Sequence, residues 1–434
     1  PVGDIPSYCY RLKYRETQMR DAEGKLPLSQ LPHKQAAGTG SICLLEGVRV
    51  LDLTTSIAGP YATLLLADFG ANVIKVERRE GDDTRGWGPP FLAQQSLWFL
   101  SVNRNKRSIT LDFSQPEGRE LLHALVSHHD VVVTNQIERS QRKLGIDYAT
   151  LSALCPGLVH VSITGFGVLG ARSDLPSYDL IAEGYSGVMD LTGEAGAPPQ
   201  KVGTPAADML AGMDAAMAVA AAMYRRRADG KGCAIDISMV ESMTRFMAPR
   251  LVSFLGSGEL PRRSGARDSV VAVYQAFDTA DEPITLGLGN DGIWRRFWAA
   301  VGEADYGADA RFRSNQDRRA ARPEIVARIQ SVLRQRKRDA WLDLFAQHRI
   351  PAGPINRLDE VAADRELHAR GMLYSVGAFD TAIPQVGLGI HIDNSSETYR
   401  TPPPGLGEHT DAVLRELLGV DDARLARLRK NKII

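Results

Sequence analysis

Two aspartates occupy positions where a carboxylate could do chemistry. Asp208 follows Thr204 and Pro205, where a threonine could cap a helix and a proline could begin it. The carboxylate would then lie in the first helical turn, which favours its ionised form and suits a nucleophile in a partly buried crevice. Asp179 follows Tyr178 and also begins a predicted helix. The alternative for both acids is a structural role in which they only offset the helix dipole.

Cations and amides at predicted strand ends form a second group. The loop 55–60, TSIAGP, follows a strand and opens a helix whose free N–H groups favour phosphate. Arg78 closes the next strand, and Arg104 precedes another. Asn135 and Lys143 follow a further strand end. Because ligands bind at the carboxyl ends of parallel strands, this group could hold a ligand with several phosphates; the alternative is a plain turn among solvated cations.

A glycine motif suggests a different ligand. Gly287, Gly289 and Gly292 form a GxGxxG pattern between a predicted strand and a predicted helix, which in other contexts binds a dinucleotide. No complete strand-helix-strand unit surrounds the motif, and no acid ends a following strand. We therefore interpret it as a tight turn.

The charge balance of the chain excludes one class of partner. The 434 residues include 52 Lys and Arg and 52 Asp and Glu, which leaves no overall basic field for nucleic acid. The longest apolar run, near 215–223, is too short to cross a bilayer, so we expect no membrane partner.

The cysteines and histidines predict neither disulfides nor a metal site. Cys9, Cys43, Cys155 and Cys233 are far apart, and the histidines form no cluster beyond the doublet 128–129. A reducing compartment fits this pattern. We expect a cytoplasmic protein, or one of the mitochondrial matrix if an import segment has been removed.

Alternating strand and helix patterns predict an α/β fold. Short strands that are apolar on both sides alternate with helices, which is typical of a Rossmann-like parallel sheet with helices on both faces. The pattern is clearest in the segments 48–54, 59–70, 72–77, 108–113, 116–129, 130–135 and 158–167. A long helix is predicted from about 205 to 227, and another from 241 to 255.

A passage rich in Gly, Ser, Pro and Arg at 256–265 marks the best domain boundary. We predict a smaller α+β domain after it. The expected division is an N-terminal extension at 1–43, the first part of the large domain at 44–239, a linker at 240–264, the small domain at 265–350, and a C-terminal part at 351–434 that rejoins the large domain.

Seven segments, taken together, resemble the class III CoA-transferases, a family that includes formyl-CoA transferase and the 2-methylacyl-CoA racemases. Their order and spacing cover most of the chain from about Leu45 to Thr410. The segments are LEGVRVLDLTTSIAGPYATLLLADFGANVIKVER, GDDTRGWGPP, NRNKRSITLDF, ITGFGVLGARSDLPSYDLIAEGYSG, GTPAADMLAG, RIPAGPINRLDEV and PPPGLGEHT.

The resemblance implies a covalent mechanism at Asp208. In such transferases the aspartate of the segment that reads PAADMLAG here attacks an acyl-CoA thioester, giving an aspartyl anhydride and then an aspartyl-CoA thioester. A free carboxylic acid then accepts CoA by the reverse steps. Asp179 would be the second active-site acid. The acyl-CoA is a substrate, and no tightly bound cofactor is expected.

The same resemblance implies a CoA site and a dimer. Family members are homodimers whose chains interlock like ring links, and a small-domain loop of one subunit would cover Asp208 of the other. The residues expected to contact CoA, together with Arg104 from the pattern above, are Ser56, Ile57, Ala58, Arg78, Leu111, Asn135, Gln136, Lys143 and Leu144.

Departures from the family pattern bear on the substrate. The glycine run of formyl-CoA transferase is absent, and 264–267 reads SGAR, so formate or oxalate chemistry is not expected. The segment 134–139, TNQIER, departs from the usual adenine-binding sequence. We expect a small dicarboxylate such as succinate, glutarate or a C5 hydroxy acid, with Arg267 and Arg104 pairing its second carboxylate.

Two other functions remain open. A 2-methylacyl-CoA racemase would share the fold, but it needs a histidine before the aspartate, where this chain has Tyr178 before Asp179. The pKa of a tyrosine, near 10, suits that proton transfer poorly. The other alternative is a non-enzymatic CoA-binding module whose carboxylates are structural.

Overall fold

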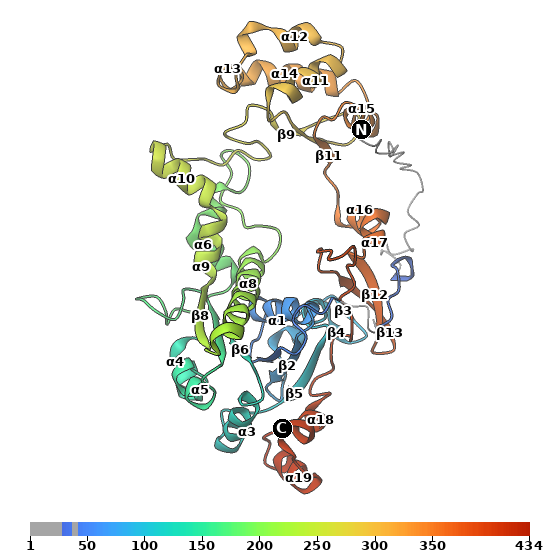
Figure 1. Ribbon diagram of the computed structural model, residues 1–434. Helices are drawn as coiled ribbons and strands as arrows, with labels where there is room; N and C mark the ends of the chain where they lie inside the picture. Colours follow the sequence, from blue (N-terminus) through green and yellow to red (C-terminus); the bar gives the residue numbers. More distant parts are fainter. Residues whose placement is uncertain (1–27, 37–41) are drawn as a thin grey trace. The chain divides into compact units, whose positions relative to one another are not determined.

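The computed structural model describes residues 28–36 and 42–434 (Figure 1). Within them the chain forms two compact units. The larger contains residues up to Asp190, Gln200–Glu259 and Asp364–Ile434, and the smaller contains Leu191–Pro199 and Leu260–Ala363.

Most of the extension predicted at 1–43 lies outside the described residues. Its described part runs beside the strand β12 (Leu373–Ala378), where Lys34 N–H donates to Ser375 O at 2.8 Å and Ser375 N–H donates to Pro32 O at 2.9 Å.

A six-stranded parallel sheet forms the centre of the larger unit, which confirms the α/β prediction. Its strand order is β5-β2-β1-β6-β7-β8. The chain adds β2 and β5 on one side of β1, and then crosses to the other side of β1 to add β6, β7 and β8. This reversal is the switch point at which such sheets bind ligands. The strands are β1 (Arg49–Asp52), β2 (Asn72–Glu77), β5 (Lys106–Thr110), β6 (Val131–Thr134), β7 (Val159–Thr164) and β8 (Cys233–Ser238).

Burial explains the apolar character of these strands. All residues of β6 and β7 are buried, as expected for parallel strands that are covered on both sides. Leu51, Ile109 and Val132 pack in one cluster with Leu122 and Leu125 of a helix. The helices of this region are α1 (Ala58–Asp68), α2 (Leu97–Ser101), α3 (Pro116–Val126), α4 (Glu138–Leu144), α5 (Tyr148–Leu154), α6 (Asp179–Ser186) and α7 (Val188–Leu191).

The C-terminal segment belongs to the larger unit. Val413, Leu425 and Ile433 join the cluster that contains Leu51. Beside β12, the segment forms β13 (Thr381–Val386), α17 (Arg365–Ala369), α18 (Thr410–Leu418) and α19 (Asp422–Lys430).

The long helix α8 (Ala206–Asp229) packs against α1, β7 and β8. By length and composition alone it could cross a membrane, a test that core helices of soluble proteins also pass. The prediction of a single helix at 241–255 is wrong, because this segment forms two helices, α9 (Met239–Phe246) and α10 (Ala248–Ser257). Pro249, in the first turn of α10, explains the break, because its ring and missing N–H disfavour a continuous helix.

The smaller unit is built around an antiparallel sheet, β11-β10-β9, and an aromatic core that includes Trp294, Trp298 and Trp341. Gly287 ends β10, and Asn290 caps the following helix, so the GxGxxG segment forms a turn into that helix. The elements are β9 (Tyr274–Phe277), β10 (Ile284–Gly287), β11 (Ala352–Pro354), α11 (Asp291–Ala300), α12 (Ala304–Ala308), α13 (Asn315–Ala320), α14 (Arg322–Leu333), α15 (Arg338–Gln347) and α16 (Leu358–Ala362).

Arg104 is part of the core of the larger unit. It is 2% exposed, its Nε donates to Asp68 Oδ1 at 3.1 Å, and its Nη1 donates to Gln385 Oε1 at 3.3 Å. Asp68 is 0% exposed, so the pair is fully removed from water.

Replacing Arg104 therefore leaves a buried carboxylate without its cation. Arg104→Met should lower the free energy of unfolding by roughly 3–5 kcal/mol, measured by urea denaturation. The matched control Arg107→Met breaks a more exposed pair with Glu416 and should cost less than about 1 kcal/mol. Equal losses in the two variants would contradict this role.

Candidate active site

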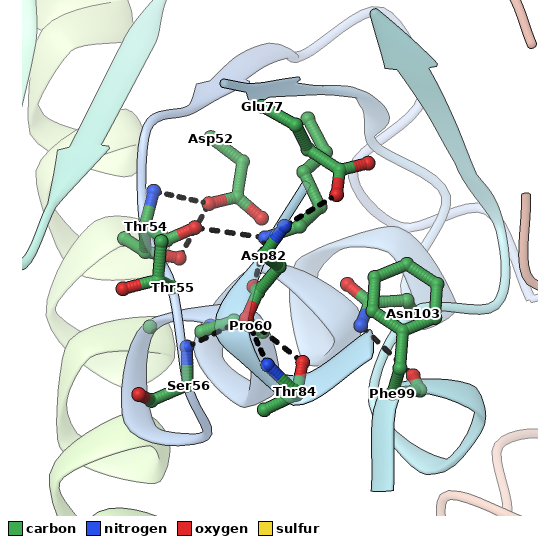
Figure 2. A network of polar contacts seen from close by, with 12 residues as sticks. Asp52, Thr54, Thr55, Ser56, Pro60, Glu77, Asp82, Thr84, Phe99 and Asn103 are labelled. Carbon is green, nitrogen blue, oxygen red and sulfur yellow. Dashed lines mark hydrogen bonds and ion pairs between the residues drawn. The ribbon is translucent and has the colours of Figure 1, made fainter. Parts of the chain in front are cut away.

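The loop after β1 is held by buried side chains from β1 and from the segment that follows β2 (Figure 2). Asp52 Oδ1 accepts from Thr54 N–H at 2.9 Å, and Asp82 Oδ1 accepts from Ser56 N–H at 3.1 Å. Ser56 has a φ of 67°, a left-handed conformation that a serine adopts only where its surroundings impose it. These bonds fix the backbone where the first helix of the sheet begins.

Two buried lysines stabilise the acids that hold this loop. Lys75 Nζ lies 2.8 Å from Asp82 Oδ2 and donates to Thr54 O at 2.8 Å. Lys106 Nζ lies 3.2 Å from Asp52 Oδ2. Burial alone would raise the pKa of Asp52, but the charges of Lys106 and Lys75 lower it to about 2. Burial also lowers the pKa of Lys106 to about 8, despite the opposing charge of Asp52.

Asn135 links the two strands at the switch point. Its Oδ1 accepts from Thr55 N–H at 3.2 Å, and its Nδ2 donates to Thr55 O at 2.8 Å. The amide predicted to contact a ligand is thus engaged with the loop after β1. Its observed contacts order the predicted binding loop.

A close helix contact brings α8 against the same loop. A Cβ added to Gly212 would lie 2.8 Å from Ala58 O, so the two backbones meet here without space for a side chain. Ile57 is 2% exposed and packs in a small cluster with Met209. Because Asp208 and Gly212 are four residues apart on one helix, they share a face. Asp208 therefore lies on the side of α8 that contacts Ile57 and Ala58.

Asp179 caps the helix that carries Asp208. Its Oδ1 accepts from Ala207 N–H at 2.7 Å and from Asp208 N–H at 3.2 Å. The sequence suggested that Thr204 caps this helix and that Pro205 begins it, which is wrong: α8 begins at Ala206, and Pro205 occupies the cap position without a side-chain capping bond. A carboxylate from α6 supplies the acceptor instead, so the two predicted acids are brought together by the start of α8.

The expected ionisation of Asp208 needs a correction. Burial, followed by the negative charge of Asp179, raises its pKa from the ordinary 3.8 to about 7. The favourable helix end does not offset these two effects. Asp208 therefore keeps its proton to a much higher pH than an ordinary aspartate, because its carboxylate is poorly stabilised when charged.

A cavity of about 460 Å³ lies beside the end of β2. Arg78, Leu111 and Leu144, three residues predicted to contact CoA, line it together with Arg79 and Lys432. Arg78 is more than half exposed and donates to Gly81 O at 2.9 Å and to Asp83. The cavity thus combines apolar walls with three cations and two acids, Glu80 and Asp112.

The structure does not bring every predicted contact to this cavity. Arg104 was predicted to face a ligand, but it is buried against Asp68, so neither a phosphate nor a second substrate carboxylate can reach it. Gln136 O accepts from Gln141 Nε2 at 2.7 Å, and Lys143 is exposed on α4. Arg267 is exposed in the smaller unit.

Two residues near these sites were missed in the sequence. Glu183 lies four residues after Asp179 on α6, a spacing that could have indicated a shared face. Lys432 reaches the cavity because Ile433 O accepts from Asp112 N–H at 2.7 Å. Such a pairing between distant segments leaves no local sequence signal. Among residues 28–36 and 42–434, no group of three or more His, Cys, Asp or Glu side chains is placed to hold a metal ion.

Comparisons with known proteins agree with this architecture. The family model described as CoA-transferase family III matches residues 45–410. Succinate–glutarate CoA-transferase of Agrobacterium fabrum is 38% identical over 382 residues, which cover 86% of this chain and 95% of that protein. The mouse succinyl-CoA:glutarate CoA-transferase is 34% identical over 392 residues, 90% of each chain. A CaiB/BaiF family protein from Brucella suis has a TM-score of 0.77 at 37% identity, covering 87% of this chain and 100% of that one.

The raised pKa of Asp208 can be measured directly. In protein labelled at the aspartate carboxyl carbons, the NMR resonance that Asp208→Asn removes should titrate near 7. Asp179→Asn should lower that midpoint by roughly one unit, because it removes the like charge while its amide oxygen can still accept from Ala207. The exposed control Asp174→Asn should leave it unchanged.

The direction of the Asp208 pKa shift also determines how the free energy of unfolding changes with pH. A raised folded-state pKa means that the folded chain binds this proton more tightly, so Asp208 destabilises the fold as pH rises from 3.8 through about 7. A midpoint near 3.8 in the wild-type protein would contradict the assignment.

Proposed function

The chain belongs to CoA-transferase family III, and we propose that it moves CoA from succinyl-CoA or a similar thioester to a small dicarboxylic acid with Asp208 as the nucleophile. The observation that carries the proposal is the position of Asp208: it lies in the first turn of α8, on the face that contacts Ile57 and Ala58, with a pKa near 7.

The proposed reaction has four balanced steps. An oxygen of ionised Asp208 attacks the thioester carbonyl, and the C–S bond breaks to give an aspartyl anhydride and CoA thiolate. The thiolate attacks the aspartyl carbonyl and releases the donor acid, leaving an aspartyl-CoA thioester. The acceptor carboxylate attacks this thioester, which restores an anhydride and thiolate. The thiolate finally takes the acceptor acyl group and frees Asp208.

The environment of Asp208 supports nucleophilic attack. Burial and the charge of Asp179 destabilise the ionised acid, so it gains stability when it forms an uncharged acyl adduct. Because one thioester is broken and another is made, the reaction needs no ATP. Exclusion of water from the anhydride is then the main requirement.

The cavity at Arg78 supports a CoA site. Leu111 and Leu144 offer an apolar surface for the adenine ring, and Arg78, Arg79 and Lys432 offer cations for phosphates. Ser56–Ala58, at the start of α1, would lie along the path toward Asp208, where helix N–H groups favour a phosphate or an oxyanion.

The names of the relatives support a dicarboxylate substrate. The two related transferases are named for succinate or succinyl-CoA and glutarate. Because Arg104 is engaged with Asp68, Arg267 alone of the two predicted cations remains available for the second carboxylate.

The racemase alternative has no support at the required position. The residue before Asp179 is Tyr178, whose side chain is 69% exposed and whose phenol suits proton abstraction poorly at neutral pH. Family membership favours an enzyme over a non-catalytic CoA-binding module.

We also infer a homodimer with interlocked subunits. The described larger unit exposes many large apolar side chains on neighbouring helices, and such surfaces mark protein interfaces. On α8, α9 and α10 these are Met213, Met217, Tyr224, Phe246, Val252 and Leu255.

Removal of the Asp208 carboxylate should abolish turnover. Asp208→Ala should lower kcat with succinyl-CoA and glutarate by on the order of 10³-fold or more, because the covalent route is lost. The control Asp229→Ala, at the other end of the same helix, should retain activity. Hydroxylamine trapping and peptide mass spectrometry of the wild-type protein should locate the adduct on Asp208, and normal thioester exchange by Asp208→Ala would refute the mechanism.

Substrate class can be tested with acceptors of equal length. With succinyl-CoA as donor, glutarate should be used with a kcat/KM at least about tenfold above that of pentanoate, because one charge-assisted contact contributes about 1.5–3 kcal/mol. Arg267→Met should reduce that preference. A preference for pentanoate would contradict the dicarboxylate proposal and leave the transferase assignment intact.

A further inference from the structure

Glu183 is a buried carboxyl group one helical turn from Asp179. It is 0% exposed on α6, and its Oε2 accepts from Val202 N–H at 2.9 Å. Val202 precedes the start of α8, whose first N–H groups bind Asp179. Both acids of α6 therefore hold the chain that carries Asp208.

The second oxygen of Glu183 has no donor among the described residues. Oε1 is buried and without a hydrogen-bond partner, although Glu183 contacts the side chain of Asp179. Two ionised carboxylates can only accept hydrogen bonds. The contact becomes a hydrogen bond only when one of the two groups carries a proton.

The surroundings of Glu183 favour that proton. Burial raises its pKa most, the Val202 N–H opposes this, and the charge of Asp179 raises it further. Lys201 favours the ionised form, but its Nζ donates to Val202 O at 3.0 Å and its side chain is exposed.

No described cation on the helices packed against α6 is placed to offset the charges of Glu183 and Asp179 in place of a proton. On α9, which packs against α6, Arg245 is paired with Asp214 of α8, and Glu241 is exposed. The remaining charge is Asp208, which is negative when ionised.

We propose that Glu183 is a positioning residue that retains one proton and donates it from Oε1 to Asp179. Asp179 is then held as the acceptor for the first N–H groups of α8, and Asp208 lies beside a pair of acids that carries one negative charge instead of two. The effect on catalysis rests on the proposed function, whereas the shared proton does not.

The shared proton has a direct consequence for the nucleophile. A second full charge beside Asp208 would raise its pKa further and deplete the ionised form at neutral pH. Loss of the Oε1–H donor would also free the Asp179 side chain to leave the start of α8. Both effects act through Asp179, because fully buried Glu183 has no face for a substrate.

Infrared spectroscopy tests the proton without any substrate. In protein labelled at the glutamate side-chain carboxyl carbons, the carbonyl band of one protonated glutamate should appear at pH 7.5, about three units above the ordinary pKa of an exposed glutamate, and should disappear in Glu183→Gln. Glu241→Gln, which removes an exposed carboxyl, should retain the band. Absence of the band, or its persistence in Glu183→Gln, would overturn the proposal.

Kinetics test the positioning role. Glu183→Gln keeps an acceptor for Val202 and a donor for Asp179, so kcat should fall by less than about threefold. Glu183→Leu loses both, and kcat should fall at least about tenfold with little change in KM for acyl-CoA. A tenfold loss in Glu183→Gln would refute the role even if Glu183→Leu does not fold. If the infrared band is found but Asp208→Ala stays active, the proposed function fails and the shared proton stands.

Discussion

The contact between Asp179 and the first turn of α8 is the constraint on which the site depends. One carboxylate oxygen accepts from the N–H groups of Ala207 and Asp208, and this fixes where the helix starts. The same carboxylate places a negative charge beside Asp208 and, after burial, contributes to raising its pKa to about 7. The interaction that orients the proposed nucleophile therefore also makes its ionised form costly, which favours its conversion to an uncharged acyl adduct.

Buried ion pairs hold the loop after β1 in place. Lys75 and Lys106 neutralise Asp82 and Asp52, and these acids bind the backbone of the loop after β1. Buried ion pairs tolerate little displacement, because a buried charge that loses its partner destabilises the folded state by roughly 3–5 kcal/mol. The loop can thus keep the strained Ser56 conformation. The close contact of Gly212 with Ala58 places α8 against this rigid loop.

Local patterns predicted the elements well where a local cause forms them. The two-sided apolar strands and their helices give the parallel sheet, and the long helix begins near Asp208 as its proline and small residues indicate. Predictions about partners were less successful. Thr204 does not cap α8, because Asp179 accepts hydrogen bonds from its first N–H groups. Arg104 does not face a ligand, because it is paired with Asp68. Both contacts join residues that are far apart in the sequence. Pro249 was a visible signal for the break between α9 and α10.

The sequence by itself determined the α/β class, the family and the candidate nucleophile, since strand periodicity, helix starts and the ordered family segments are all local features. Only the tertiary structure decided which acids meet, which lysines are buried and that Lys432 reaches the cavity of Arg78. The physical reason is that burial and charge proximity depend on contacts between segments far apart in the chain. These contacts convert Asp208 from an ordinary first-turn acid into one that titrates near neutral pH.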